Sequence, residues 1–376
     1  MPSEIMWLQK ISVLNFKNYT EAKLTLLPTV NVFAGKNGAG KTNLLDAIHY
    51  LSICKSYFNP IDTQQVRQGT DFFMIQGVFE KDGQEEVVSC GFKRGNKKQF
   101  KRNKKEYQRL ADHIGLFPLV MISPNDVNNI NEGSEERRRF IDSIISQTDR
   151  VYLDELIAYN HCLANRNALL RQVASSGRYD AGLLEIYDEQ LVGLGTQIFA
   201  KRKAFMQIFT PLFYKHYAYI TDDQEEVELV YDSLLYTHDF ATLLTQRLDR
   251  DRALERTTVG IHKDDLLFSI VGMPLKKFGS QGQQKSFLIA LKLAQYTFLT
   301  QQKGFKPLLL LDDIFDKLDE CRIQKLMQMV SDKDFGQLCI TDTNRVRIEK
   351  IFEEIGVPIQ VFDIAKGEVI SSATAV

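Results

Sequence analysis

Hydrophobic and polar residues alternate over short stretches near the start of the chain, and this pattern predicts β-strands. Residues 5–33 fit two strands joined by a polar turn, followed by the short apolar run 30–33. Residues 72–92 alternate around Gly83, which predicts an antiparallel hairpin. Between these stretches, apolar residues at three- and four-residue spacing predict a helix over about 41–53.

The middle of the chain changes to a helical spacing of its hydrophobic residues. The spacing runs from about 134 to 217, interrupted by the polar sequence at 175–177. Two long helices joined by such a turn are expected to pack antiparallel. A strand over 226–235 and a helix over 238–254 follow.

Strands and helices alternate again in the last third of the chain. A strand precedes the Gly- and Gln-rich sequence at 279–285, and the apolar stretch 286–299 predicts a helix. The remaining elements are expected as a strand at 307–313, a helix at 320–331, a strand at 337–341, a helix at 345–355 and a strand at 357–363. Two α/β portions therefore flank a mostly helical insert, which predicts an α/β fold.

A phosphate-binding motif lies between the strand at 30–33 and the helix at 41–53. The motif is G-x-x-x-x-G-K-[ST], and its residues are Gly35, Lys36, Asn37, Gly38, Ala39, Gly40, Lys41 and Thr42. Glycines allow backbone N–H groups to surround an anion at the start of a helix. Lys41 is placed to reach the β- and γ-phosphates of ATP, and Thr42 to bind Mg²⁺. The alternative is a glycine-rich turn followed by lysine and threonine by chance.

Two acids, Asp312 and Asp313, follow a run of four leucines. Beside a phosphate loop, Asp312 would hold Mg²⁺, and Asp313 would orient or deprotonate the attacking water. The pair lies about 270 residues after Lys41, and we expect the two strands to be adjacent and parallel. A plain turn with a helix cap is the alternative for these acids.

A second anion-binding design occurs at residues 280–284, immediately before a helix. Ser280 offers a hydroxyl, Gly282 offers flexibility, and the helix that follows Gln283 begins with exposed N–H groups. A chain with its own phosphate loop has no need of a second cradle for the same nucleotide. We therefore predict that this sequence caps the γ-phosphate of ATP bound to another copy of the chain.

Residues 93–109 carry nine basic residues and one acid, Glu106. With Phe100 and Tyr107 interleaved among them, they are candidates for contact with a DNA backbone. The DNA-binding candidates are Lys97, Lys98, Lys101, Arg102, Lys104 and Lys105. The alternative is a solvated hairpin whose charges protect the edge of a sheet.

Composition narrows these possibilities only slightly. The 376 residues are 44% hydrophobic and 25% charged, which is typical of a globular protein, and the net charge of −1 does not indicate a nucleic-acid partner. No apolar run is long enough to cross a membrane, and no secretory signal is evident. The five cysteines show no C-x-x-C spacing, so we expect free thiols in a cytoplasmic protein.

The combined motifs resemble an ABC-type ATPase of the chromosome-maintenance (SMC-like) kind, and more narrowly the RecF family of recombination-repair proteins. The resemblance covers nearly the whole chain. Beyond the motifs above, it is carried by residues 14–19 (LNFKNY), 42–48 (TNLLDAI), 123–126 (SPND), 137–142 (RRRFID), 166–170 (RNALL), 260–265 (GIHKDD) and 310–313 (LLDD).

This resemblance implies a two-lobed ATPase head. Lobe I would be the ATP-binding portion, residues 1–112 plus 255–376, and lobe II would be the helical insertion at 113–254. ATP and Mg²⁺ are the implied cofactors, and an ATP-dependent homodimer on double-stranded DNA is the implied assembly. Slow hydrolysis would release the DNA, and the partner RecR would assist recombinase loading at single-strand gaps and their junctions.

Three other classes compete with this interpretation. They are a transporter-type ABC subunit, another DNA-end-binding SMC-like ATPase, and a small P-loop kinase or GTPase. The long helical insert disfavours the transporter subunit, and the second anion cradle disfavours the kinase or GTPase.

Several positions depart from the wider ABC pattern. Asp313 stands where most ABC ATPases have glutamate, as it also does in the RecF family. Ser123 lies near the place of a phosphate-sensing glutamine, and Thr341 to Thr343 lie near that of a histidine. Asp319 matches the loop that meets the opposing subunit, and Lys263 replaces an arginine of the family pattern.

Overall fold

The computed structural model describes residues 6–176, 181–222, 225–314, 320–332 and 334–375. The chain forms two compact units. The first contains residues 1–126, 219–222 and 285–376, and the second contains residues 127–218 and 223–284. Residues 113–126 thus group with the first unit and residues 255–284 with the second, which differs from the lobe boundaries expected from the sequence.

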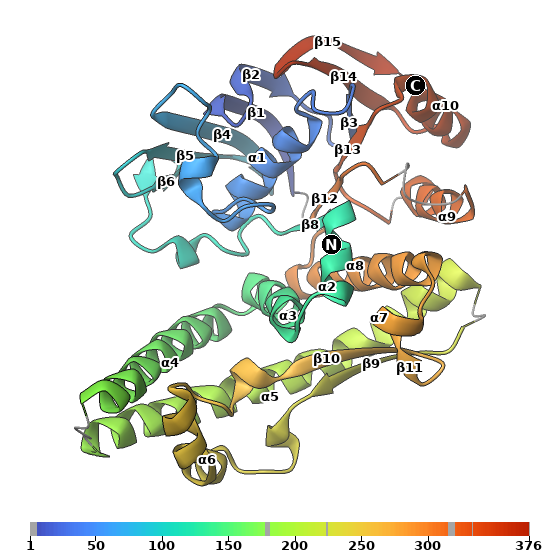
Figure 1. Cartoon of the computed structure of the whole chain (residues 1–376). Coiled ribbons are helices and arrows are strands. Elements are labelled where there is room, and N and C mark those ends of the chain that lie inside the picture. Colours follow the sequence, from blue (N-terminus) through green and yellow to red (C-terminus); the bar gives the residue numbers. More distant parts are fainter. Residues whose placement is uncertain (1–5, 177–180, 223–224, 315–319, 333, 376) are drawn as a thin grey trace. The chain divides into compact units, whose positions relative to one another are not determined.

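An antiparallel sheet forms one layer of the first unit (Figure 1). Its strand order is β2-β1-β4-β5-β6-β7. The hairpin expected around Gly83 is confirmed, with φ values of 54° at Asp82 and 75° at Gly83 in the tight turn. The strands are β1 (Met6–Phe16), β2 (Tyr19–Thr25), β4 (Phe72–Lys81), β5 (Gln84–Lys93), β6 (Gln99–Arg102) and β7 (Lys105–Glu106).

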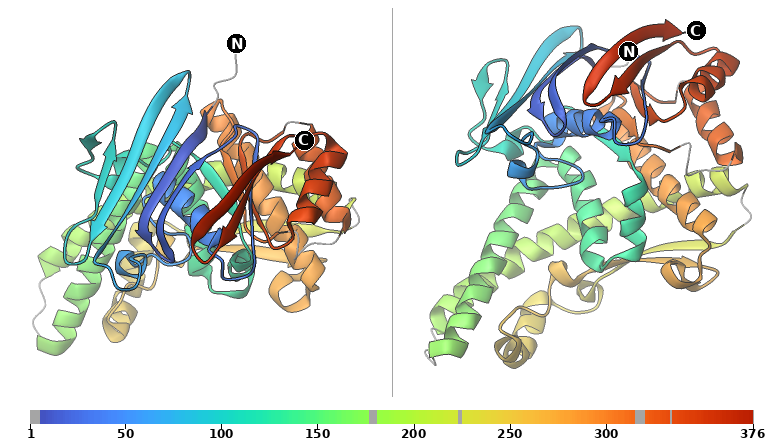
Figure 2. Two further views of the ribbon diagram at one scale, coloured as in Figure 1. Left: turned by 90° about the horizontal axis from the view of Figure 1, so that it is seen from above. Right: turned by 45° about the horizontal axis from the view of Figure 1, so that its top comes forward.

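A second, mostly parallel sheet has the order β15-β14-β3-β13-β12-β8. Only the β14–β15 hairpin, coloured red in Figure 2, is antiparallel. The strands are β3 (Val30–Ala34), β8 (Leu119–Ile122), β12 (Leu308–Leu311), β13 (Leu338–Asp342), β14 (Ile359–Ala365) and β15 (Glu368–Ala375).

The expectation that the phosphate-loop strand and the acid-pair strand are adjacent is wrong. The phosphate loop follows β3 and the acids follow β12, but β13 pairs with both strands and separates them. All three strands are buried along their whole length and are mostly apolar, so their pattern does not specify which pairs with which.

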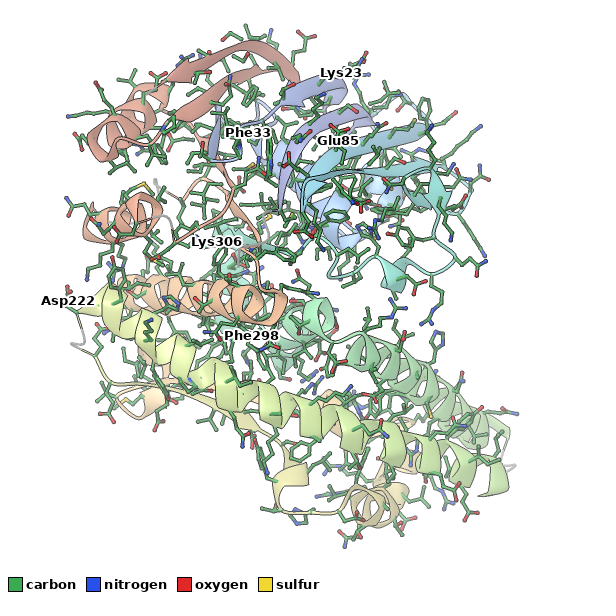
Figure 3. The ribbon with its side chains drawn as sticks, turned by 180° about the vertical axis from the view of Figure 1, so that it is seen from behind. Lys23, Phe33, Glu85, Asp222, Phe298 and Lys306 are labelled. Atoms are coloured by element: carbon green, nitrogen blue, oxygen red, sulfur yellow. The ribbon has the colours of Figure 1, made fainter. Side chains whose placement is uncertain are left out.

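Helix α1 (Lys41–Ile53) lies between the two sheets, packing against β4 of one and β13 of the other. It is therefore buried on nearly all sides, including Leu44, Leu45 and Ile48. The core continues into the parallel sheet, where Phe33, labelled in Figure 3, packs against Phe362 with ring centroids 5.7 Å apart. The helix that carries the phosphate loop is thus held rigidly by the core.

Three more α-helices belong wholly or mostly to the first unit. They are α8 (Gln281–Lys303), which begins in the second unit, α9 (Glu320–Ser331) and α10 (Arg345–Ile355). Short 3-10 turns occur at η1 (Asp62–Gln64), η2 (Leu110–Asp112) and η3 (Pro124–Val127). Helix α8 is apolar on most sides and buries its residues from Ser286 to Leu293.

The second unit is mainly helical, which confirms the expectation for residues 134–217. Its helices are α2 (Asn128–Asn131), α3 (Ser134–Thr148), α4 (Arg150–Ser176), α5 (Ala181–Thr221), α6 (Phe240–Leu254) and α7 (Leu275–Phe278), with 3-10 turns η4 (Leu234–Tyr236) and η5 (Ile261–Lys263). The last residues of α5 belong to the first unit. A small sheet has the order β11-β10-β9, formed by β9 (Val227–Asp232), β10 (Asp265–Ile270) and β11 (Met273–Pro274).

A buried arginine joins the elements of the second unit. Arg202 of α5 donates to both carboxylate oxygens of Asp142 in α3, at 2.9 and 3.0 Å, and to the carbonyl of Ile261 in η5, at 2.9 Å. Arg202 also pairs with Asp264 at 3.3 Å, so its loss would leave two carboxylates without this partner. Within the described residues, no helix is long and apolar enough to cross a membrane.

His113 is a buried histidine of the first unit, and it should make the stability of that unit depend on pH. Burial lowers the pKa of His113 to about 4, and its ring bonds to the Leu51 carbonyl at 2.7 Å and the Tyr107 hydroxyl at 3.1 Å. Between pH 4 and 6.5 the unfolded chain binds the proton that the folded chain excludes, so stability falls as pH falls. We expect the contribution of His113 to be about 2 kcal/mol between pH 7 and pH 5.

Urea unfolding of the wild type and of His113→Gln at these two pH values measures that contribution. Glutamine can keep both hydrogen bonds without titrating, so the variant should lose less stability on acidification. His238→Gln, at an exposed position, serves as the control. Equal pH dependence for His113→Gln and wild type would contradict the assignment.

Candidate nucleotide site

The phosphate loop (residues 35–42) joins the end of β3 to the start of α1. Gly40 precedes the helix with φ of 118°, a conformation that favours glycine, and an added Cβ there would lie 2.7 Å from the Asn18 side chain. Gly38 has φ of 77°, and a Cβ there would meet nothing within 4 Å. Open space beside a turn of backbone N–H groups at a helix start suits a phosphate group.

Lys41 lies at the first position of α1 and is only 4% exposed. Its ammonium group donates to the carbonyls of Gly35 at 2.9 Å and Lys36 at 3.3 Å. The side chain therefore folds back over its own loop. This arrangement keeps the positive charge of Lys41 at the phosphate loop, bonded to the carbonyls of the loop itself.

Thr42 and Asp312 come together even though their strands are not neighbours. The Thr42 hydroxyl donates to Asp312 Oδ1 at 2.8 Å, and the Thr341 hydroxyl of the intervening β13 donates to the same oxygen at 2.9 Å. Burial raises the pKa of Asp312, and the neighbouring Asp313 acts in the same direction, while the two hydroxyl groups oppose it. A hydroxyl and a buried carboxylate are oxygen donors of the kind that Mg²⁺ prefers.

Asp313 adopts a left-handed conformation with φ of 44°, which is uncommon for a residue other than glycine. Its N–H donates to the Thr341 hydroxyl at 2.8 Å. The turn after β12 is thereby fixed to β13, with the Asp313 carboxylate next to that of Asp312. Strained backbone of this kind is concentrated at functional sites.

Two turns support the phosphate loop from outside, and sequence reasoning assigned neither of them a role. The Asn18 amide donates to the Ala39 carbonyl at 3.1 Å and accepts from Asn43 at 2.7 Å. From the β14–β15 turn, the Gly367 N–H donates to the same carbonyl at 2.9 Å. Asn18 lies within the LNFKNY motif, which was the only sequence signal for this support.

Ser123 follows β8 and belongs to a buried polar cluster. Its N–H donates to the Asp126 carboxylate at 2.7 Å, and that carboxylate pairs with Lys292 of α8 at 2.8 Å. The Tyr57 hydroxyl also bonds to Asp126. These contacts hold the loop at 123–126 in place, while Asp319, expected to meet an opposing subunit, lies outside the described residues.

The Ser280 sequence, in the second unit, forms the cap of α8. The Ser280 N–H donates to the Gln283 side chain at 2.8 Å, and the Gln283 N–H donates to the Ser280 hydroxyl at 3.2 Å. This reciprocal pair is a capping box. Ser280 is exposed, Gly282 lies within the first turn of α8, and the nearby Phe278 is 61% exposed.

The basic stretch at 93–109 proves to be partly structural. Lys98 pairs with Asp62 at 3.1 Å, and Arg102 donates to Glu86 at 2.9 Å. Phe100 is 1% exposed and belongs to the core, so it is not available to stack on bases. The four other candidates, Lys97, Lys101, Lys104 and Lys105, are exposed or half-exposed.

Three features together define the class of protein: a phosphate loop after β3 in a mostly parallel sheet, an acid pair two strands away, and a signature sequence in the second unit that caps α8. The chain has the ABC-type ATPase head fold of the SMC-like kind, as its sequence predicts. The family model described as "RecF/RecN/SMC N terminal domain" matches residues 7–364.

The relatives make the assignment more specific. The chain is 51% identical over 359 residues to the DNA replication and repair protein RecF of Flavobacterium johnsoniae, covering 96% of this chain and 100% of that protein. It is 49% identical over 366 residues to RecF of Phocaeicola vulgatus, covering 97% and 98%. A solved structure of the recombination mediator protein RecF-ATP in the RecFOR pathway superposes with a TM-score of 0.88 at 29% identity, covering 99% and 98%. The chain belongs to the RecF family of DNA replication and repair proteins.

Proposed function

We propose that this chain is an ATP-switched DNA-binding protein of recombination repair. ATP would bind with Mg²⁺ at the phosphate loop and drive two copies together on duplex DNA. Slow hydrolysis would then release the DNA, and RecR would act with it at single-strand gap junctions. The observation that carries this proposal is the convergence of Thr42, Asp312 and Thr341 beside the phosphate loop, in a chain of the RecF family.

Each residue of the site has a role in this proposal. The backbone N–H groups of residues 35–42 would bind the phosphates, and Lys41 would leave its loop carbonyls to reach the β- and γ-phosphates. Thr42 and Asp312 would hold Mg²⁺, which neutralises phosphate charge when it is bound. Asp313, held by Thr341, would orient and deprotonate the attacking water.

The exposure of the signature sequence supports its action on a second copy of the chain. Ser280 is exposed, and the exposed apolar residues Val271, Met273 and Phe278 precede it in sequence. Polar capping groups next to exposed apolar side chains are typical of surfaces that meet a partner. The second copy would present its Ser280 and Gln283 to the γ-phosphate.

The proposed DNA contact of the basic stretch rests on four lysines, because Lys98 and Arg102 already hold carboxylates of the same unit. These four are Lys97, Lys101, Lys104 and Lys105. We expect their joint replacement by glutamine to weaken duplex binding at low salt. The slope of log affinity against log salt should decrease by about one for each lost phosphate contact.

Fluorescence anisotropy with a labelled duplex, measured with ATP, with ADP and without nucleotide, tests both the ATP dependence of duplex binding and the contact by the four lysines. The wild type should bind duplex most tightly with ATP. Lys98→Gln is the matched control, since Lys98 lies in the same stretch but is committed to Asp62. If wild-type binding at low salt does not depend on ATP, the proposed function fails. If the four-lysine variant binds normally, only the contact site is wrong.

A further inference from the structure

A groove of about 580 Å³ lies on the antiparallel sheet of the first unit, next to the basic stretch. Its walls are Phe72 and Met74 of β4 and Gln99 of β6, and Gly91 of β5 lies between them. Figure 2 shows β4 and β5 side by side along this sheet. The groove is within the volume range of small-ligand sites in proteins.

Strand alternation and one glycine produce the groove. Phe73 and Ile75 point into the core, so Phe72 and Met74 project outward and are 38% and 44% exposed. Gly91 pairs with Met74 on one side and Gln99 on the other, and a Cβ at Gly91 would meet nothing within 4 Å. The missing side chain leaves a flat floor between an apolar wall and an amide.

The lysines of the groove differ in whether they already have partners within the protein. Lys98 donates to the Tyr50 hydroxyl and the Cys54 carbonyl and pairs with Asp62. Lys93 and Lys97 are exposed, and neither forms an ion pair among the described residues. Glu106 is the only acid of the lining.

Opposite Glu106, on the neighbouring strand β6, is Lys101. The groove thus has an exposed aromatic ring (Phe72), a flat floor at Gly91, and two lysines without ion-pair partners among the described residues, Lys93 and Lys97.

We propose that this groove binds one unpaired nucleotide of single-stranded DNA. The base would lie over Gly91 and stack on Phe72, and its phosphates would meet Lys93 and Lys97. Aromatic side chains beside a cationic track are the usual design for single strands. A duplex keeps its bases stacked inside, so it would use Lys97 of this groove but neither Phe72 nor the floor at Gly91. This inference rests on the proposed DNA-binding function and adds a strand-specific contact to it.

Filling the groove tests the proposal without changing any charge. Valine at position 91 suits a strand and has open space in which to project, so Gly91→Val should fold. Ser89→Val is the matched control, because Ser89 lies two residues away on the same face of β5. Phe72→Leu is a second variant that removes the stacking ring at an exposed position.

Binding is measured by anisotropy with labelled oligo-dT and with a blunt duplex, using the full chain and ATP. Gly91→Val and Phe72→Leu should each weaken oligo-dT binding about tenfold, the effect expected for losing one stacked base. Both should bind the duplex as the wild type does, and Ser89→Val should bind both probes normally. This pattern would support the groove as a single-strand site.

Other outcomes overturn the proposal in distinguishable ways. Normal oligo-dT binding by Gly91→Val, or equal loss in Ser89→Val, would remove the groove from DNA recognition. A wild type that binds duplex in an ATP-dependent manner but not oligo-dT would refute the groove and keep the proposed function. A wild type that binds neither probe would overturn the proposed function and the groove with it.

Discussion

Replacing Asp313 with asparagine is expected to lower ATP hydrolysis by about 10²- to 10⁴-fold, the usual contribution of a general base, and to leave ATP affinity nearly unchanged. Asparagine matches the shape of aspartate and tolerates the left-handed conformation at φ of 44°. The backbone bond from residue 313 to Thr341 does not depend on the side chain and should persist. Only the ability to accept a proton is lost.

Phosphate release in a single turnover and the affinity for a fluorescent ATP analogue measure the two effects separately. Asp312→Asn is the informative comparison, because Asp312 receives the hydroxyl groups of Thr42 and Thr341 and would hold the metal. That variant should lose Mg²⁺-dependent ATP affinity as well as hydrolysis. If Asp313→Asn hydrolyses ATP within a few-fold of the wild type, another group activates the water.

The Asp313→Asn variant should also prolong the DNA-bound state. If ATP holds two copies together and hydrolysis releases them, a chain that binds but does not hydrolyse ATP should dissociate slowly from duplex DNA. Dissociation as fast as that of the wild type would separate DNA release from hydrolysis.

Local sequence signals were sufficient for much of the nucleotide site. The helix expected at 41–53 is α1 (Lys41–Ile53), and the helix expected at 345–355 is α10 (Arg345–Ile355). In the phosphate loop, the positive φ values of Gly38 and Gly40 are met by glycines in the motif itself. Such features depend on residues close in sequence, so a pattern can specify them.

Long-range pairing could not be predicted in the same way. The strands β3, β13 and β12 are all buried and mostly apolar, so their sequences specify neither their order nor the contacts of Thr341 with Asp312 and Asp313. The support of the phosphate loop by Asn18 and Gly367 depends on turns that meet only in the folded chain.

The basic stretch shows a related limit. Nine cations in a short segment indicate an exposed surface, but the acids that neutralise two of them are distant in sequence. Glu86 lies on β5 and binds Arg102, and Asp62 lies in η1 and binds Lys98. Charge counting within a segment therefore overestimates the cations available to DNA.

Replacing Ser280 with arginine is expected to abolish ATP-dependent dimerisation while ATP still binds to the monomer. Ser280 is exposed at the start of α8, where a large side chain would enter the proposed contact with the second copy. Steric and charge mismatch at such a contact typically costs several kcal/mol, so the dimerisation constant should fall at least about a hundredfold. Light scattering with ATP and sizing without it measure this change.

The loss of the helix cap must be separated from the loss of the contact. Ser280 accepts a hydrogen bond from the Gln283 N–H, and loss of such a cap costs about 1 kcal/mol. Ser280→Asn keeps a capping side chain without adding bulk or charge and should dimerise nearly as the wild type does. A dimerisation defect of equal size in both variants would attribute the effect to α8 itself.

Mixing two inactive variants gives the sharper test of a composite site. Lys41→Met should disable the phosphate loop of one chain, while Ser280→Arg disables the signature of the other. In a mixed dimer, the intact phosphate loop of the Ser280→Arg chain would face the intact signature of the Lys41→Met chain, which restores one complete site. ATP hydrolysis should therefore reappear on mixing. If no activity returns and Ser280→Arg alone still dimerises with ATP, the signature does not act across the dimer, and each nucleotide site is complete within one chain.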